Sequence, residues 1–239
     1  MNIFQLAKII IINKITHFGV IYRLITLNHF FKKNNIKIND NLLDIGFNEG
    51  FYRSYFLKMN DKLNYNGVEI DDKFLNKYPN TFYHNFENQK LDKSFDFIFL
   101  SHVLEHINDD KKFIKNISNS LNSNESKLLI RVPIPTNENI FLRKFNSNNH
   151  EHHEHERDGY TLSEMKKLLN ESELLLESYF LSCYSIGMFT HTFFEILRDR
   201  QTRFQRILQI PYILLTLLDI AFQNEKKSSD LLVIATKKK

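Results

Sequence analysis

The sequence predicts an α/β fold in which a seven-stranded, mainly parallel sheet carries helices on both of its faces. Two observations predict this fold. Short apolar runs alternate with helical patterns through the middle of the chain, as they do in units of strand, helix and strand. The run at residues 95–101, Phe-Asp-Phe-Ile-Phe-Leu-Ser, is almost wholly apolar, which is typical of a central strand covered on both faces.

The chain is expected to form a single domain, because 239 residues of which 42% are hydrophobic suffice for one large core. We expect a helical cap at 1–38, an α/β core at 39–182, a helical lid or insertion at 183–226 and a terminal strand segment at 227–239. The expected strands lie at 42–46, 65–70, 81–84, 95–101, 127–132, 174–182 and 230–236.

Helices are expected between these strands. One follows the first strand at 51–58, and another begins near Asn108, which we take as its N-cap. Thr161 and Glu164 have the spacing of a capping box and predict the start of a late helix. The stretch 186–222 is expected to be helical and to divide at Pro211.

Composition excludes several classes of protein. The formal charge of +4 arises from 32 basic and 28 acidic residues spread along the chain, so no nucleic-acid partner is expected. Cys183 is the one cysteine and cannot form an internal disulfide, which favours a reducing compartment such as the cytoplasm. Charged residues interrupt the isoleucine-rich start, so we expect no signal peptide.

A nucleotide site is predicted at the turn after the first strand. Gly46 and Gly50 lie on this turn, where a missing side chain lets the backbone approach a ligand. Glu69 ends the second strand 23 residues after Gly46, near the spacing at which a carboxylate meets a ribose. Asn48 breaks the dinucleotide fingerprint and Glu49 adds negative charge, which disfavours a nicotinamide cofactor.

Three segments resemble class I S-adenosylmethionine-dependent methyltransferases of the type that acts on small molecules. They are Asp-Ile-Gly-Phe-Asn-Glu-Gly at 44–50, Gly-Val-Glu-Ile-Asp at 67–71, and Ser-Phe-Asp-Phe-Ile at 94–98 followed by Ser-His-Val-Leu-Glu-His-Ile at 101–107. The resemblance covers residues 41–160 and implies a Rossmann-like fold with S-adenosyl-L-methionine as cofactor. Asn48 departs from the family's middle glycine, although asparagine tolerates a positive φ well.

The resemblance also implies which residues contact the cofactor. Asn85 stands where family members often have an acid that binds the adenine amino group, and Phe86 is placed to stack on the base. The implied cofactor-binding residues are Asp44, Gly46, Phe47, Asn48, Gly50, Glu69, Ile70, Asn85, Phe86, Ser101 and His102.

Three histidines are candidates for a catalytic base. His102 and His106 follow the fourth strand, at the edge of the sheet where ligands bind. The competing interpretation is that His106 and Glu105 only fix this loop. His155 adjoins the family-like segment 155–161 and closes a run rich in histidine and glutamate, for which we expect no metal site because ligands in one segment rarely converge.

The segment 155–161 resembles the loop before the late helix in members that modify sugars, lipids or polysaccharides. It implies O-methylation of a small molecule, a sugar or a glycolipid or polysaccharide intermediate. The apolar helical faces of 186–222 are a candidate for peripheral membrane contact. The alternative is a degenerate methyltransferase fold that serves as a non-catalytic binding or membrane-peripheral module. The oligomeric state stays open.

Overall fold

The computed structural model describes residues 1–15, 17–38, 40–135, 156–200, 205–222 and 228–238. Seven strands form one sheet in the order β3-β2-β1-β4-β5-β7-β6. The first five in this order run parallel, while β7 pairs antiparallel with both β5 and β6. The expected seven-stranded, mainly parallel sheet is therefore confirmed. The strands are β1 Asn41–Ile45, β2 Asn64–Glu69, β3 Thr81–Tyr83, β4 Phe97–Ser101, β5 Lys127–Pro133, β6 Leu174–Ser182 and β7 Asp230–Lys237.

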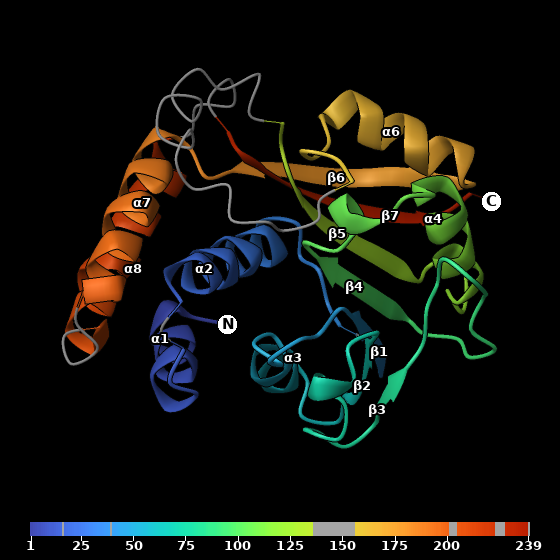
Figure 1. Cartoon of the computed structure of the whole chain (residues 1–239), viewed down its shortest axis with the longest axis horizontal. Coiled ribbons are helices and arrows are strands. Elements are labelled where there is room, and N and C mark those ends of the chain that lie inside the picture. The colour runs from blue at the N-terminus through green and yellow to red at the C-terminus, as the bar shows by residue number, and fades with distance from the viewer. Residues whose placement is uncertain (16, 39, 136–155, 201–204, 223–227, 239) are drawn as a thin grey trace.

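Helices cover both faces of the sheet (Figure 1). Side chains of β4 alternate between two cores, with Phe97 and Phe99 in one and Ile98 and Leu100 in the other. The first core also receives helices α1 Ile3–Ile12, α2 Phe18–Lys33, α7 Ser185–Arg200 and α8 Gln205–Ala221, together with α3 Arg53–Met59. The second core receives α4 Asp110–Asn119 and α6 Leu162–Glu171. The N-terminal helices and the helical insertion before the last strand are thus where the sequence predicts them.

Local sequence explains how two of these helices begin. The Thr161 side chain accepts from the Glu164 backbone N–H while Glu164 reaches back to the Thr161 N–H, so the predicted capping box is confirmed. The predicted cap of α4 is wrong by one residue. Asp109 occupies the N-cap and accepts from the Lys112 N–H at 3.0 Å, a position where its negative charge also favours the helix dipole.

The predicted division of the C-terminal helical stretch is also wrong. Pro211 lies inside α8, near its start, rather than between two helices. Pro211 is the seventh residue of α8, beyond the first four whose N–H groups have no intrahelical acceptor, so it removes one internal hydrogen bond while the helix continues past it. Helix α7 ends at Arg200 and α8 begins at Gln205, so the change of helix precedes the proline.

The strand order determines where in the sheet a ligand-binding crevice forms. β1 and β4 are neighbours in the sheet, and β2 and β5 lie on their outer sides. The chain therefore leaves β1 and β4 toward opposite sides, which opens a crevice at their carboxyl ends. Ligands bind at such switch points in open α/β sheets.

Candidate active site

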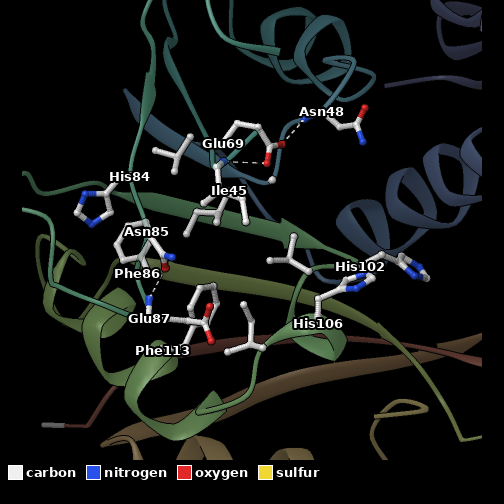
Figure 2. A pocket seen from close by; sticks show the side chains of 15 residues that line it. Ile45, Asn48, Glu69, His84, Asn85, Phe86, Glu87, His102, His106 and Phe113 are labelled. Carbon is white, nitrogen blue, oxygen red and sulfur yellow. Dashed lines mark hydrogen bonds between the residues drawn. The ribbon is translucent and has the colours of Figure 1, made fainter. Parts of the chain in front are cut away.

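A pocket of about 230 Å³ lies at the carboxyl ends of β1, β2 and β4 (Figure 2). Its walls come from the turn after β1, the end of β2, the segment after β3 and the segment after β4. The structure brings together most of the sequence-predicted residues here. Those that line the pocket are Gly46, Asn48, Glu69, Ile70, Asn85, Phe86, His102 and His106.

The turn after β1 has the shape expected from its residue types. Gly46 has a φ of 69°, and the Asn48 φ of 48° is also left-handed. Asparagine tolerates this region better than other non-glycine residues, so Asn48 preserves the turn in place of a glycine. A Cβ on Gly46 would lie 2.5 Å from a Val103 methyl carbon, so the glycine is also needed for packing against the segment after β4.

Glu69 is held at the rim of the pocket by two backbone groups. Its Oε2 accepts from the Asn48 N–H at 3.0 Å, and its Oε1 accepts from the Ile70 N–H at 3.0 Å (Figure 2). A carboxylate has about four lone-pair sites, so each oxygen retains one for a further donor. The carboxylate is therefore fixed beside the turn and still able to accept from a pair of hydroxyl groups.

Gly50 and Phe47 belong to the turn but do not line the pocket. A Cβ on Gly50 would lie 2.4 Å from the Tyr78 ring, so the protein itself fills the space beside this glycine. The Phe47 ring is buried and packs over Gly67 of β2. Their place in the structure favours a role in shaping the turn.

Asp44 is buried behind the turn and accepts a 2.6 Å hydrogen bond from the Tyr65 hydroxyl. Burial raises the pKa of the Asp44 carboxyl to about 7, against the lowering effect of Tyr65 and with a further raising effect from the Glu69 charge. Ser101, at the end of β4, lies 3.2 Å from the Tyr52 hydroxyl and is likewise outside the pocket lining. Both residues support the pocket from behind.

Asn85 and Phe86 form the wall that faces Glu69 across the pocket (Figure 2). The Asn85 Oδ1 accepts from the Glu87 N–H at 2.8 Å, which fixes the orientation of the amide. The Phe86 ring meets His84 edge-on, with ring centroids 4.5 Å apart. This wall combines an apolar ring with oriented polar groups, as small-molecule sites do.

His102 follows β4 in a left-handed conformation with a φ of 56°. Its ring lies between two acidic side chains, with Nδ1 3.1 Å from Glu105 Oε1 and Nε2 3.6 Å from Asp230 Oδ1. Nε2 and Asp230 Oδ1 are both buried and have no hydrogen-bond partner among the described residues. A proton on Nε2 would therefore lie beside an acceptor that already faces it.

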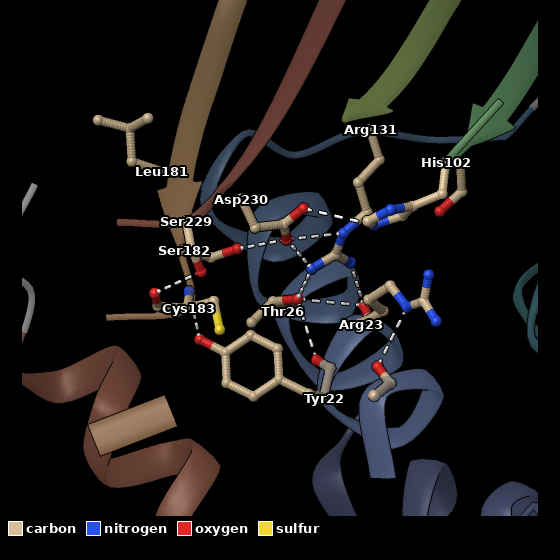
Figure 3. A network of polar contacts seen from close by, with 12 residues as sticks. Tyr22, Arg23, Thr26, His102, Arg131, Leu181, Ser182, Cys183, Ser229 and Asp230 are labelled. Atoms are coloured by element: carbon tan, nitrogen blue, oxygen red, sulfur yellow. Dashed lines mark hydrogen bonds and ion pairs between the residues drawn. The ribbon is translucent and has the colours of Figure 1, made fainter. Parts of the chain in front are cut away.

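Asp230 joins His102 to a buried network around Arg131 (Figure 3). Arg131 Nε donates to Asp230 Oδ2 at 2.8 Å. Arg131 Nη2 contacts the same oxygen and also donates to Thr26 Oγ1 at 2.9 Å. Ser182 Oγ donates to Asp230 as well, at 2.9 Å. Burial alone would raise the pKa of Asp230, but Arg131 and His102 outweigh this effect and hold the pKa well below its usual value.

Sequence reasoning missed Arg131 and Asp230. The available signals were an arginine within an apolar strand and an aspartate at the start of the terminal strand. A buried charge needs a partner, but its identity depends on β7 lying beside β5, where Arg131 is in register with Leu232 and Pro133 with Asp230.

Of the other two histidine candidates, only His106 lies among the described residues. His106, in the short 3₁₀ helix Leu104–His106, is exposed and lines the pocket. His155 and the histidine-rich run before it lie outside the described residues. Among the residues that the structure describes, no group of three or more metal-ligating side chains converges.

The site combines a switch-point pocket, a left-handed turn after β1, and a fixed carboxylate at the end of β2. Asn48 on the turn breaks the dinucleotide fingerprint, and the Glu69 carboxylate is compatible with a cofactor that carries a ribose and no phosphate. This fold and site define a class I methyltransferase. The family comparison agrees, since residues 19–179 match the model of the methyltransferase domain, and the chain belongs to this family of S-adenosylmethionine-dependent enzymes.

Solved structures show the same fold. A phosphoethanolamine N-methyltransferase 2 from Haemonchus contortus, in complex with S-adenosylmethionine, has a TM-score of 0.55 at 16% identity, with 89% of this chain and 52% of that chain covered. An S-adenosylmethionine-dependent methyltransferase from Clostridium acetobutylicum has a TM-score of 0.56 at 13% identity, with 94% and 92% covered. Coclaurine N-methyltransferase, bound to N-methylheliamine and S-adenosylhomocysteine, has a TM-score of 0.55 at 11% identity, with 89% and 70% covered. The search of curated proteins found no match.

Proposed function

We propose that this methyltransferase binds S-adenosylmethionine in the pocket at the ends of β1, β2 and β4 and methylates a hydroxyl group of a small molecule, sugar or glycolipid intermediate. The observation that carries the cofactor assignment is the Glu69 carboxylate, which two backbone N–H groups fix at the pocket rim while lone pairs remain for a ribose. When bound, S-adenosylmethionine supplies an electrophilic methyl group on a sulfonium.

Each wall of the pocket has a separate task in this proposal. The turn at Gly46 and Asn48 lets the backbone approach the cofactor closely, and Glu69 accepts from the ribose hydroxyls. Asn85 and Phe86 face the adenine, one with polar groups and one with an aromatic ring. Methyl transfer is an in-line displacement, so holding donor and acceptor in contact supplies much of the rate acceleration.

We assign the general base to His102. If Nδ1 donates to Glu105, Nε2 carries the lone pair that can take a proton from the acceptor hydroxyl. In the described position of the ring, to which it returns after taking the proton, the imidazolium lies between Glu105 and Asp230, and both carboxylates stabilise it. Nε2 is enclosed in the described conformation, so the partly exposed ring must turn toward the pocket to meet the acceptor.

An amine acceptor is the second candidate, favoured by the N-methyltransferases among the similar structures. The two candidates differ in their need for a base. A hydroxyl group is a weak nucleophile and gains from proton removal during transfer, whereas an unprotonated amine already carries its lone pair. The enclosed pair of His102 Nε2 and Asp230 Oδ1 supports the hydroxyl.

Isothermal titration with S-adenosylhomocysteine tests the cofactor site. Glu69→Gln should weaken binding about tenfold or more, because charge-assisted hydrogen bonds contribute about 1.5–3 kcal/mol each. Glu49→Gln is the matched control, since Glu49 lies on the same turn but pairs with Lys77 and does not line the pocket. Folded wild-type protein that gives no heat with millimolar ligand would overturn the site assignment.

The acceptor class is tested separately, by transfer of a labelled methyl group from S-adenosylmethionine. The acceptors offered are sugars, hydroxylated small molecules and lipid-linked sugars on one side and primary and secondary amines on the other. Label in the hydroxylated compounds supports the proposal. Label in the amines alone, from protein that binds the cofactor, would refute O-methylation and leave the cofactor site intact.

A further inference from the structure

Over residues 209–222, helix α8 and the residue after it bury every polar side chain, together with Ile213 and Ile220, and expose only apolar ones. From residue 209 to residue 222 its polar side chains are Gln209, Tyr212, Thr216 and Asp219, and each is buried, with at most 2% of its surface exposed. This is the reverse of the usual pattern for a helix at a protein surface, where polar residues face solvent.

Buried contacts fix the rotation of α8. Gln209 Nε2 donates to the Ile15 carbonyl at 2.7 Å near the start of the helix. Near its end, Asp219 accepts from the Tyr22 hydroxyl at 2.6 Å and from the Gly187 N–H at 2.7 Å, the second of which satisfies a free N–H in the first turn of α7. Rotating α8 to bury its other face would break these bonds and leave a buried carboxylate unpaired.

The outer face of α8 is consequently apolar from residue 210 to the end of the helix. Every exposed position from 210 to 222 carries a side chain that neither donates nor accepts hydrogen bonds. These positions are Ile210, Pro211, Leu214, Leu217, Leu218, Ala221 and Phe222. Phe222 is 68% exposed, Ile210 63% and Leu214 58%, and helix α7 beside it adds the exposed Phe189 and Phe193, whose rings stack.

The chemistry of this face favours hydrocarbon over protein as its occupant. Protein interfaces carry about one hydrogen bond per 100–200 Å², and the exposed side chains between residues 210 and 222 offer none. The chain also carries a formal net charge of +4. A net positive charge favours a surface of anionic lipid headgroups over a neutral one.

The depth of contact is limited by the length of the apolar segment. No helix among the described residues is long and apolar enough to cross a membrane. A helix of this kind lies in the plane of the interface instead, with its apolar side chains among the upper acyl chains.

We propose that the outer face of α8 docks this enzyme on an anionic lipid surface. The proposal does not depend on which group the enzyme methylates or on which residue is the general base. It rests on the exposed apolar faces of α8 and α7 and on the charge of the chain. Its place in the fold is the first-core side of the sheet, where α7 and α8 stand beside α2 (Figure 1).

Flotation with vesicles tests the proposal, using equal parts of phosphatidylglycerol and phosphatidylcholine against phosphatidylcholine alone. The full chain should float with the anionic vesicles. The double variant Leu214→Gln with Leu218→Gln should bind about a hundredfold more weakly, at roughly tenfold per leucine withdrawn from hydrocarbon. The control pair is Leu175→Gln with Tyr179→Gln, which removes two exposed apolar side chains from β6 and should leave vesicle binding unchanged.

Two further measurements complete the test. Titration of the α8 double variant with S-adenosylhomocysteine checks that the fold is intact, so a folded variant that has lost vesicle binding supports the proposal. Sedimentation without lipid examines the competing occupant, a second copy of the chain. A wild-type dimer that the α8 substitutions dissociate would overturn the proposal, as would wild-type protein that fails to float.

Discussion

Asp44 is a carboxyl group whose ordinary ionisation the fold suppresses. It is buried, it accepts a hydrogen bond from the Tyr65 hydroxyl, and its pKa of about 7 lies above that of an unfolded chain, about 3.9. Between these two values the folded state keeps a proton that the unfolded state has released. Linkage then requires the free energy of unfolding to fall as the pH rises through this range.

The expected loss for wild type is at most about 4 kcal/mol between pH 4 and pH 7, from about three pKa units at 1.36 kcal/mol each. Asp44→Asn removes the titrating group and should flatten this part of the profile, while Asp61→Asn, at an exposed position, should not change it. Urea unfolding at several pH values measures the effect. Identical slopes for wild type and Asp44→Asn would show that Asp44 ionises normally.

His102 and His106 both line the pocket, but only His102 lies between two carboxylates. His102→Gln should lower kcat about a hundredfold or more, the usual contribution of a general base, with little change in KM for S-adenosylmethionine. His106→Gln is the matched control and should lower kcat far less. Steady-state kinetics with a hydroxyl acceptor distinguish the two, and equal losses in both variants would contradict the assignment of the base.

At the scale of single elements, α6 begins with a complete capping box. Thr161→Ala removes the side-chain acceptor of the Glu164 N–H and should cost about 1 kcal/mol of unfolding free energy. Ser163→Ala, two residues further on and exposed, should be nearly neutral. Thermal or urea unfolding compares them, and a neutral Thr161→Ala would mean that tertiary contacts alone define this helix end.

The elements also show what could be predicted from sequence and what could not. Strand positions and the capping box depend on local patterns, so the sequence was enough for them. The predicted N-cap of α4 was one residue too early, because Asn108 and Asp109 are both good N-cap residues. Only the backbone geometry shows that Asp109 occupies this position. The polar inner face of α8 was not predicted, because Gln209 and Asp219 bind residues more than 30 positions away.

The same distinction applies to the candidate site. Glu69 and the turn at Gly46 come from spacing within one strand–helix–strand unit, and the structure places both at the pocket. Gly50 has the family pattern, yet Tyr78 fills the space beside it, which no local pattern could indicate. The carboxylate beside His102 Nε2 was missed because it comes from the last strand of the sheet.

At the scale of the whole molecule, cofactor binding should stabilise the fold. A ligand that binds only the folded state at a hundred times its Kd adds about 2.7 kcal/mol. For a protein of 239 residues this corresponds to a rise in Tm of roughly 5–10 °C. Scanning calorimetry with S-adenosylhomocysteine measures the rise, and Glu69→Gln at the same ligand concentration should show a smaller one. An unchanged Tm for wild type at saturating ligand would contradict the proposed site.

The sheet closes with the last strand inserted between two that precede it in the chain, since β7 lies between β5 and β6. β6 therefore has no neighbour in the sheet until residues 230–237 have been made and have paired with it. Asp230 arrives with that strand, and until then Arg131 has no carboxylate and His102 lacks one of its two. Pairing of the last strand and completion of the acidic surroundings of His102 are thus one event, and a folding chain cannot hold this histidine between two carboxylates before residue 230 has joined the sheet.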